Sequence, residues 1–165
     1  MKKSLVMLAV LCCAAFAMAT ELENLIKEPM TITNPATTVM ENGVYTITNA
    51  NDKTKSVLRY KVVFDKADVD AVTFAVEGKA MENVGQHGCY FGMILDLLHT
   101  DNTWTYGVNF GMGKDTFDWC LRYRPFKSKK PIKEIVVSVQ YTKAQGKVAF
   151  RNPQLYLGLQ DLNKK

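Results

Sequence analysis

The segment Trp104–Tyr156 decides the fold, and it reads WTYGVNFGMGKDTFDWCLRYRPFKSKKPIKEIVVSVQYTKAQGKVAFRNPQLY. Its longest β-branched run, Ile132–Tyr141, has the length and composition of a strand. Ala144–Gly146 then predicts a turn into a further strand, Lys147–Phe150. We therefore expect antiparallel strands to dominate this half of the chain.

Two aromatic-rich strands precede that run. Alternation in Thr103–Phe110 and in Thr116–Tyr123 places aromatic and apolar residues on one face of each strand. The residues on these faces are Trp104, Tyr106, Val108 and Phe110 in the first strand, and Phe117, Trp119, Leu121 and Tyr123 in the second. We expect Phe117 and Trp119 to pack in the core, together with Val148 and Phe150.

The rest of the chain continues the strand pattern. The expected strands are Met30–Thr33 (an edge strand between two prolines), Val44–Thr48, Ser56–Phe64, Val72–Gly78, Cys89–Leu98 and Leu155–Leu157. Gly85–Gly88 separates two of them, and Asp101–Asn102 predicts a hairpin turn. Eight or nine short strands with turn punctuation, and no convincing helix, indicate an all-β sandwich or barrel.

The first 19 residues have the features of a signal peptide. Lys2 and Lys3 precede an apolar run, and Ala17–Ala19 offers the small residues of a cleavage site. The run is shorter than the roughly 20 apolar residues that span a bilayer. We expect a single domain over residues 20–165, secreted or periplasmic, with no membrane span. A lipoprotein signal at Cys12 or Cys13 is the less favoured alternative.

The charge pattern argues against nucleic-acid binding. Removing Lys2 and Lys3 lowers the formal net charge from +5 to +3, and the remaining basic residues are scattered. The cluster Lys127–Lys130 lies between prolines in an expected loop, without the aromatic interleaving of a nucleic-acid surface. We interpret it as a solvated loop.

Cys89 and Cys120 are the two cysteines beyond the signal peptide. An oxidising compartment would allow them to form a disulfide. Both also lie in apolar strand patterns, where a buried thiol serves as a small hydrophobe. The sequence leaves both alternatives open.

Catalytic motifs are absent from the sequence. His87 and His99 are the only histidines, and their spacing is not that of a paired metal site. No G-x-S-x-G nucleophile motif occurs. The acidic segment Asp65–Asp70 lacks the glycine and distal glutamate of an EF-hand. We expect no catalytic residue and no metal site.

Aromatic residues give the stronger functional signal. Aromatic rings can stack on the apolar C–H face of a pyranose, and they offer large rigid contact area. Trp104 and Tyr106 follow the predicted hairpin turn, Tyr90 lies in the preceding strand, and Arg122 lies opposite Trp119 in the alternation. We take Trp104, Tyr106, Tyr90 and Arg122 as candidate ligand-binding residues.

The order of motifs in this half of the chain resembles a known family. The motifs are Asp101–Trp104, Tyr106–Gly107, Gly113, Thr116–Trp119, Pro125, Lys130–Ile132, Val148–Phe150 and Leu155. This order is similar to galactose-binding-like jelly-roll domains, and more narrowly to carbohydrate-binding modules of bacterial secreted proteins. The resemblance covers about Trp104–Tyr156 and implies a jelly-roll β-sandwich of two antiparallel sheets that binds glycans without catalysis.

The sequence departs from the family pattern in its closing motif. Such domains carry paired aspartates where this chain reads Phe150–Pro153, FRNP. In many of them an acid at this point helps to hold a structural calcium. Asn152 alone is a poor ligand set, so we expect no cofactor.

The sequence therefore predicts a secreted, non-catalytic carbohydrate-binding domain that recognises a polysaccharide or glycoconjugate by aromatic stacking. A first alternative is an extracytoplasmic structural or adhesion domain that binds a protein partner. A second is a small glycan-active hydrolase or lyase, which would need two acids, or a histidine and an acid, in one cleft.

Overall fold

The computed structural model describes residues 22–66 and 68–163, without the side chains of 83–89. The described residues form no helix and eight strands: β1 Thr31–Ile32, β2 Thr38–Glu41, β3 Val44–Asn49, β4 Lys55–Val63, β5 Ala71–His99, β6 Trp104–Gly111, β7 Phe117–Lys127 and β8 Ile132–Leu157. No helix among these residues could cross a bilayer. The predicted signal peptide lies outside the described residues.

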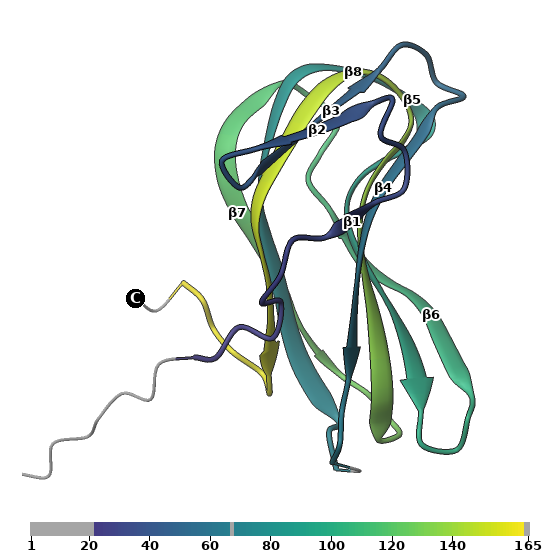
Figure 1. Ribbon diagram of the computed structural model, residues 1–165, viewed down its shortest axis with the longest axis vertical. Coiled ribbons are helices and arrows are strands. Elements are labelled where there is room, and N and C mark those ends of the chain that lie inside the picture. The colour runs from purple at the N-terminus through teal and green to yellow at the C-terminus, as the bar shows by residue number, and fades with distance from the viewer. Residues whose placement is uncertain (1–21, 67, 164–165) are drawn as a thin grey trace, which may run out of the picture.

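Two long strands build both layers of the sandwich (Figure 1). In sheet 1, residues 132–142 of β8 lie between β4 and residues 90–99 of β5, while β1 and β6 form the edges. In sheet 2, residues 144–157 of β8 lie between β3 and residues 71–85 of β5, while β2 and β7 form the edges. Every pairing is antiparallel, as predicted for a jelly-roll β-sandwich.

The two predicted interruptions of these long strands are wrong. The strand β5 continues through Gly85–Gly88, although its pairing with β8 is irregular there: Gly85 pairs with Ala144 and the next pair is Tyr90 with Thr142. Ala144–Gly146 does not reverse the chain, because β8 continues through it with positive φ angles at Lys143 and Gly146. A strand can bend at such irregularities and pass from one layer to the other. The sequence signal for a turn marked these bends.

Other predicted elements are confirmed. The strand expected around Met30–Thr33 is the short edge strand β1, and the Asp101–Asn102 turn joins β5 to β6 with a φ of 62° at Asn102. Thr103 donates its backbone N–H to the Asp101 carboxylate, 3.1 Å away, which stabilises the turn. The edge strand β2 was not predicted.

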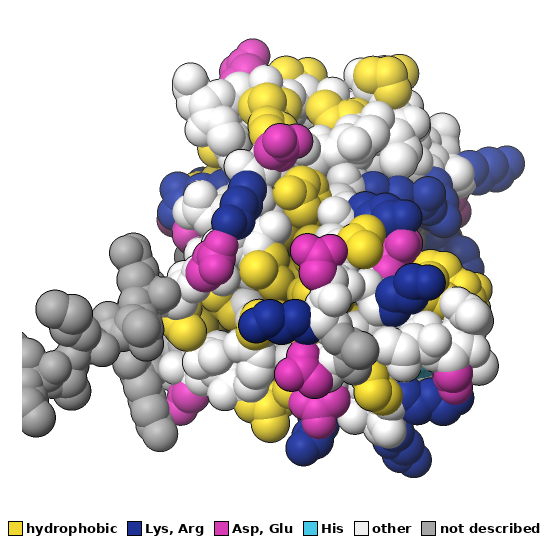
Figure 2. Space-filling model, turned by 60° about the horizontal axis from the view of Figure 1, so that its bottom comes forward, with side chains coloured by type: hydrophobic (Ala, Val, Ile, Leu, Met, Phe, Trp, Pro, Cys, Tyr) yellow, Lys and Arg dark blue, Asp and Glu magenta, His cyan; other side chains and the backbone are white. Residues whose placement is uncertain are grey.

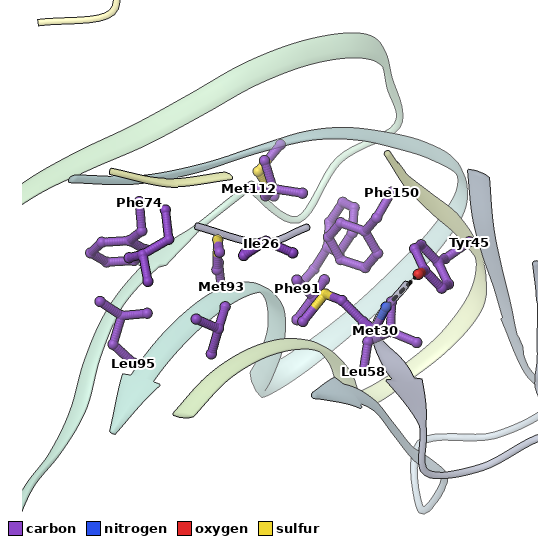
Figure 3. Packing of buried hydrophobic residues seen from close by; sticks show 14 of the residues in the cluster. Ile26, Met30, Tyr45, Leu58, Phe74, Phe91, Met93, Leu95, Met112 and Phe150 are labelled. Carbon is purple, nitrogen blue, oxygen red and sulfur yellow. Dashed lines mark hydrogen bonds between the residues drawn. The ribbon is translucent and has the colours of Figure 1, made fainter. Parts of the chain in front are cut away.

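The core lies between the two sheets (Figure 3). Phe91 is its aromatic centre, with ring centroids of Phe117, Tyr141 and Phe150 at 5.8, 5.8 and 4.8 Å. Phe150 and Val148 are fully buried, as predicted, and Phe117 is partly buried against them. Burying one such side chain stabilises the fold by about 1.5–3 kcal/mol. Core-facing residues alternate with outward-facing ones, so each sheet also presents an outer face.

Candidate functional site

Trp104 and Tyr106 form a stacked pair on the edge strand of sheet 1. Their ring centroids are 5.5 Å apart and their planes differ by 7°. Trp104 is 40% exposed and Tyr106 is 70% exposed, so most of this pair faces solvent. The two rings share one face, as alternation predicted, whereas Val108 and Phe110, which were expected on that face, pack toward the core instead.

A β-bulge positions the pair. Leu95 pairs with Val108 and Leu97 with Thr105, so Tyr106 and Gly107 together lie opposite Asp96. Gly107 has a φ of 74° and donates its N–H to the Asp96 carboxylate at 2.9 Å. Because a bulge increases the local twist of a strand, the bulge at Tyr106 and Gly107 sets the direction in which the Tyr106 ring leaves the strand.

Tyr90 lies on the same outer face but serves the fold. Its hydroxyl lies 2.8 Å from the Met93 carbonyl oxygen and 2.7 Å from the Phe110 carbonyl oxygen, to which it can donate. Burial raises the pKa of this phenol, so it stays protonated as a donor. The hydroxyl lies next to Gly92, where a Cβ would come within 2.9 Å of it. Tyr90 thus ties β5 to β6 at Phe110, toward the end of β6 that lies away from Trp104.

Arg122 does not share this face. It lies in β7, the edge strand of sheet 2, opposite Val76, and it is exposed. Its neighbour Arg124 reaches across to sheet 1 and donates from Nη1 to the carbonyl oxygen of Asn109. Of the four predicted ligand-binding residues, the structure brings together Trp104 and Tyr106, uses Tyr90 to join β5 to β6 further along the same face, and leaves Arg122 on the other sheet.

The sequence interpretation missed the polar residues beside the pair. Asp96 is half-buried on the outer face, and Asn109 is exposed on β6. Further along the same face, Lys61 and Glu134 form an ion pair at 2.7 Å. The alternation of Leu95 and Leu97 toward the core could have identified Asp96 as outward-facing.

Trp119 is not a core residue, which corrects the prediction. A register shift between Gly78 and Ala80 places Asp118 and Trp119 in a bulge, so Cys120 turns toward the core instead. The Arg151 guanidinium lies 4.3 Å from the Trp119 ring centroid, an arrangement that favours a cation–π contact. Alternation predicts a face only where a strand stays in register.

Glu77 completes this arrangement on the outer face of sheet 2. It accepts hydrogen bonds from the Arg151 Nε at 2.8 Å and the Asn152 Nδ2 at 2.7 Å. The hydrogen bond from Asn152, and then those with Arg151, hold the pKa of Glu77 below its ordinary value. Asn152 therefore serves as a hydrogen-bond donor to the Glu77 carboxylate.

The structure bears on the metal and disulfide predictions only through the residues that it describes. No cluster of three histidine, cysteine or acidic residues capable of holding a metal occurs among the described residues. Cys120 is partly buried against the core, while the Cys89 side chain lies outside the described residues, so their pairing stays a prediction. The His87 side chain likewise lies outside the described residues.

Comparison with known proteins was informative only at the level of structure. The sequence matches no protein-family model and no curated protein. The structure resembles the enzymatically active domain of tailspike protein 4 of bacteriophage CBA120, with a TM-score of 0.54 and 6% identity over 78% of this chain and 18% of that one. It also resembles a CBM4 structure, with a TM-score of 0.50 and 11% identity over 78% of this chain and 77% of that one.

A third similar structure is the CBM22-1 xylan-binding domain of Paenibacillus barcinonensis Xyn10C, with a TM-score of 0.48 and 12% identity over 84% of this chain and 94% of that one. This chain spans only 18% of the tailspike chain but most of the CBM4 structure. At these identities the likeness concerns the fold alone. The fold is therefore an all-β jelly-roll sandwich that resembles carbohydrate-binding modules, as the sequence motifs predicted.

Proposed function

We propose that this protein is a secreted, non-catalytic carbohydrate-binding domain, spanning residues 20–165, that recognises glycans by stacking at Trp104 and Tyr106. The observation that carries the proposal is the parallel pair of exposed rings on the outer face of sheet 1. The exposed ring surface of this stack offers a rigid apolar contact to the C–H face of a pyranose, and little conformational entropy is lost on binding.

Polar groups beside the rings suit the sugar hydroxyls. The second oxygen of the Asp96 carboxylate can accept a hydroxyl proton, because Oδ1 already accepts from Gly107. The Asn109 amide also lies on this face, although its Nδ2 donates to the Gly107 carbonyl oxygen at 2.7 Å. Acceptors and donors at the margin of an aromatic platform give orientation to a ligand that stacking alone would leave free.

The likeness in fold to carbohydrate-binding modules supports the same function. The proposal assigns no catalytic role to the carboxylates of this face: Asp96 accepts the Gly107 N–H, and Glu134 is held in an ion pair with Lys61 at 2.7 Å, whereas glycoside hydrolysis ordinarily uses two carboxylates that act on the sugar. The signal-peptide pattern in residues 1–19 supports export. The mass of the mature protein from an expressing cell should correspond to a chain that starts at Thr20.

Binding is tested with a glycan array followed by calorimetry on the mature protein. The change is Trp104→Ala, which we expect to weaken binding of the best glycan by roughly thirtyfold, or about 2 kcal/mol. Since Trp104 is 40% exposed, the loss of its contact with Tyr106 should lower the free energy of unfolding by only about 1 kcal/mol.

The matched control is Trp119→Ala, because Trp119 is the only other tryptophan and lies on the opposite sheet. It should leave glycan affinity unchanged. Equal losses in both variants would assign the binding to some other surface. A folded protein that binds no glycan at millimolar concentration would refute the function and leave the protein-partner alternative.

A further inference from the structure

A pocket opens next to the aromatic pair, at the end of the sandwich where the β5–β6 hairpin meets the segment that joins β7 to β8. Its volume is about 410 Å³, which lies within the range of small-ligand pockets. Trp104 lines it and also stacks on Tyr106, so the pocket is continuous with the proposed sugar platform. The proposed function does not use this pocket.

The base of the pocket is rigid and its hydrogen bonds are satisfied. His99 is 2% exposed; its Nδ1 must donate to the Pro131 carbonyl oxygen at 3.3 Å, since a carbonyl only accepts. In the neutral ring, Nε2 then accepts from the Thr105 hydroxyl at 2.8 Å. Phe126 and the buried Ser128 complete the base. A ligand therefore meets a preformed floor.

The rim of the pocket is positively charged. Lys127, Lys129 and Lys130 all line it, and they come from one short segment. Lys130 is fixed by the Asp101 carboxylate at 2.7 Å and by the Thr103 hydroxyl at 3.0 Å, which leaves one of its three N–H donors unused. The hairpin thus holds one ammonium group in place at the mouth of the pocket.

The other two lysines are less compensated. The nearest Asp70 carboxylate oxygen lies 3.6 Å from Lys127 Nζ, outside hydrogen-bond distance. The described residues give Lys129 no ion-pair partner, and it is exposed. Three ammonium groups against the carboxylates of Asp70 and Asp101 leave one positive charge unbalanced. Figure 2 shows this end of the molecule, where basic and acidic side chains are otherwise intermixed.

We propose that this pocket binds the anionic group of an acidic glycan, a carboxylate or a sulfate ester on a pyranose, while a sugar ring stacks at Trp104. This inference rests on the proposed function and adds the ligand class to it. Lys127, Lys129 and the free donor of Lys130 supply the charge. A single loop of lysines matches one localised anion, whereas a nucleic acid requires a stripe of cations that follows a phosphate chain.

The test compares three oligosaccharides by calorimetry at low salt: an oligogalacturonate, its fully methyl-esterified form, and a sulfated galactan oligosaccharide. The first pair differs only in charge, and the third distinguishes sulfate from carboxylate. We expect at least one of the two acidic ligands to bind about fivefold to tenfold more tightly than the ester, since each exposed ion pair adds modestly. Raising the salt to 1 M should remove this preference, because screening weakens exposed charge pairs.

The variant is K127Q/K129Q, which removes charge from two exposed side chains, and the matched control is K53Q/K114Q, which makes the same change in net charge elsewhere. We expect the first to abolish the acidic preference and keep the affinity for the ester, and the second to change neither. Circular dichroism checks that both variants fold.

Each of the following outcomes would contradict the proposal that the pocket binds an anionic group. Binding of both acidic ligands no tighter than that of the ester would refute the inference while leaving glycan binding intact. A preference that survives in K127Q/K129Q would place the anion elsewhere. Tighter binding of a deoxythymidine oligonucleotide than of any acidic sugar would indicate a nucleic-acid surface. Absence of binding by all three sugars and by the glycan array would refute the proposed function itself.

Discussion

The two tryptophans lie on edge strands of opposite sheets, Trp104 in β6 and Trp119 in β7, and their surroundings differ. Trp104 contacts another exposed ring, Tyr106, and both present surface to solvent. Trp119 lies under the Arg151 guanidinium, which is itself held by Glu77. The aromatic pair on the outer face of sheet 1 is therefore exposed to a ligand, whereas Trp119 on sheet 2 already contacts Arg151 of the protein itself.

The C-terminal segment covers a further part of the outer face of sheet 2. After β8 the chain folds back over sheet 2, where Leu162 packs with Ala75, Tyr156 and Tyr123. Thr73 anchors the segment by donating its hydroxyl to the Gly158 carbonyl oxygen at 2.9 Å. In Figure 1 the segment turns away from the end of β8, on the side of the molecule opposite β6. Sheet 1 has no such cover over Trp104 and Tyr106 among the described residues.

The largest expected effect is a loss of stability at Gly92, where β5 pairs with β6 in sheet 1. A Cβ at Gly92 would lie 2.2 Å from the Phe110 carbonyl oxygen and 2.9 Å from the Tyr90 hydroxyl, so Gly92→Ala must separate β5 from β6. We expect a loss of roughly 3 kcal/mol in the free energy of unfolding, measured by denaturant titration.

Gly111→Ala is the matched control, because Gly111 pairs with Gly92 but its Cβ would approach no atom closer than 3.8 Å. It should cost less than about 1 kcal/mol. If the two variants were equally stable, the Tyr90 arrangement would not be what holds β6 in place.

A smaller effect is expected on the occupied face, at Glu77. Because its pKa is lower in the folded than in the unfolded state, its contribution to stability is complete above its ordinary pKa of 4.5 and is lost as the pH falls through the folded-state pKa. Glu77→Gln should therefore lower the free energy of unfolding by about 1 kcal/mol at pH 7.

The same variant should converge with the unmodified protein in strong acid, as measured by urea titration across pH 2–7. Glycan affinity should not change at pH 7, because Glu77 lies on sheet 2. A difference in stability that stays constant with pH would exclude the carboxylate as its source.

The smallest effect is expected at the C-terminal cover. The Tyr123 hydroxyl donates to the Asp161 carboxylate at 2.8 Å and accepts from the Asn163 Nδ2 at 2.8 Å, and its pKa is raised chiefly by the hydrogen bond to Asp161. Tyr123→Phe should loosen only this segment. Hydrogen exchange at residues 159–163 should accelerate while the most protected core amides stay unchanged.

Protection of these amides that matched the unmodified protein would show that the packing of Leu162 and the hydrogen bonds with Thr73 hold the segment without the Tyr123 hydroxyl. Cooperative loss of protection in the core would instead make the cover part of the global folding unit. Either result changes the account of why the outer face of sheet 2 is occupied.

Much of the fold was predictable because the strands follow local rules. The hairpin at Asp101–Asn102 and the buried alternation of Val72, Phe74 and Val76 depend on turn residues and a period of two, and both are confirmed. The edge strand β2 was missed, since its residues Val39–Glu41 are exposed and show no clear alternation. A short edge strand is defined by its neighbour β3 rather than by its own pattern.

The candidate site was predictable only in part, and for the same reason. Trp104 and Tyr106 are two residues apart in a strand, so the sequence by itself places them on one face. Their partners come from elsewhere: Asp96 from β5, and the lysine rim from the segment after β7. The Lys127–Lys130 cluster had been interpreted as a solvated loop because its contact with the β5–β6 hairpin is not local.

The sequence by itself determined the strand content, the turn at Asp101–Asn102 and the pair of neighbouring aromatic rings, because these depend on residues a few positions apart. Only the tertiary structure decided that Trp104 is exposed to a ligand and that Trp119 contacts Arg151 instead. Bulges changed the faces of β6 and β7, and the C-terminal segment covered one sheet but not the other. A single inserted residue reverses every side chain beyond it, and such an insertion is set by cross-strand pairing that no local pattern records.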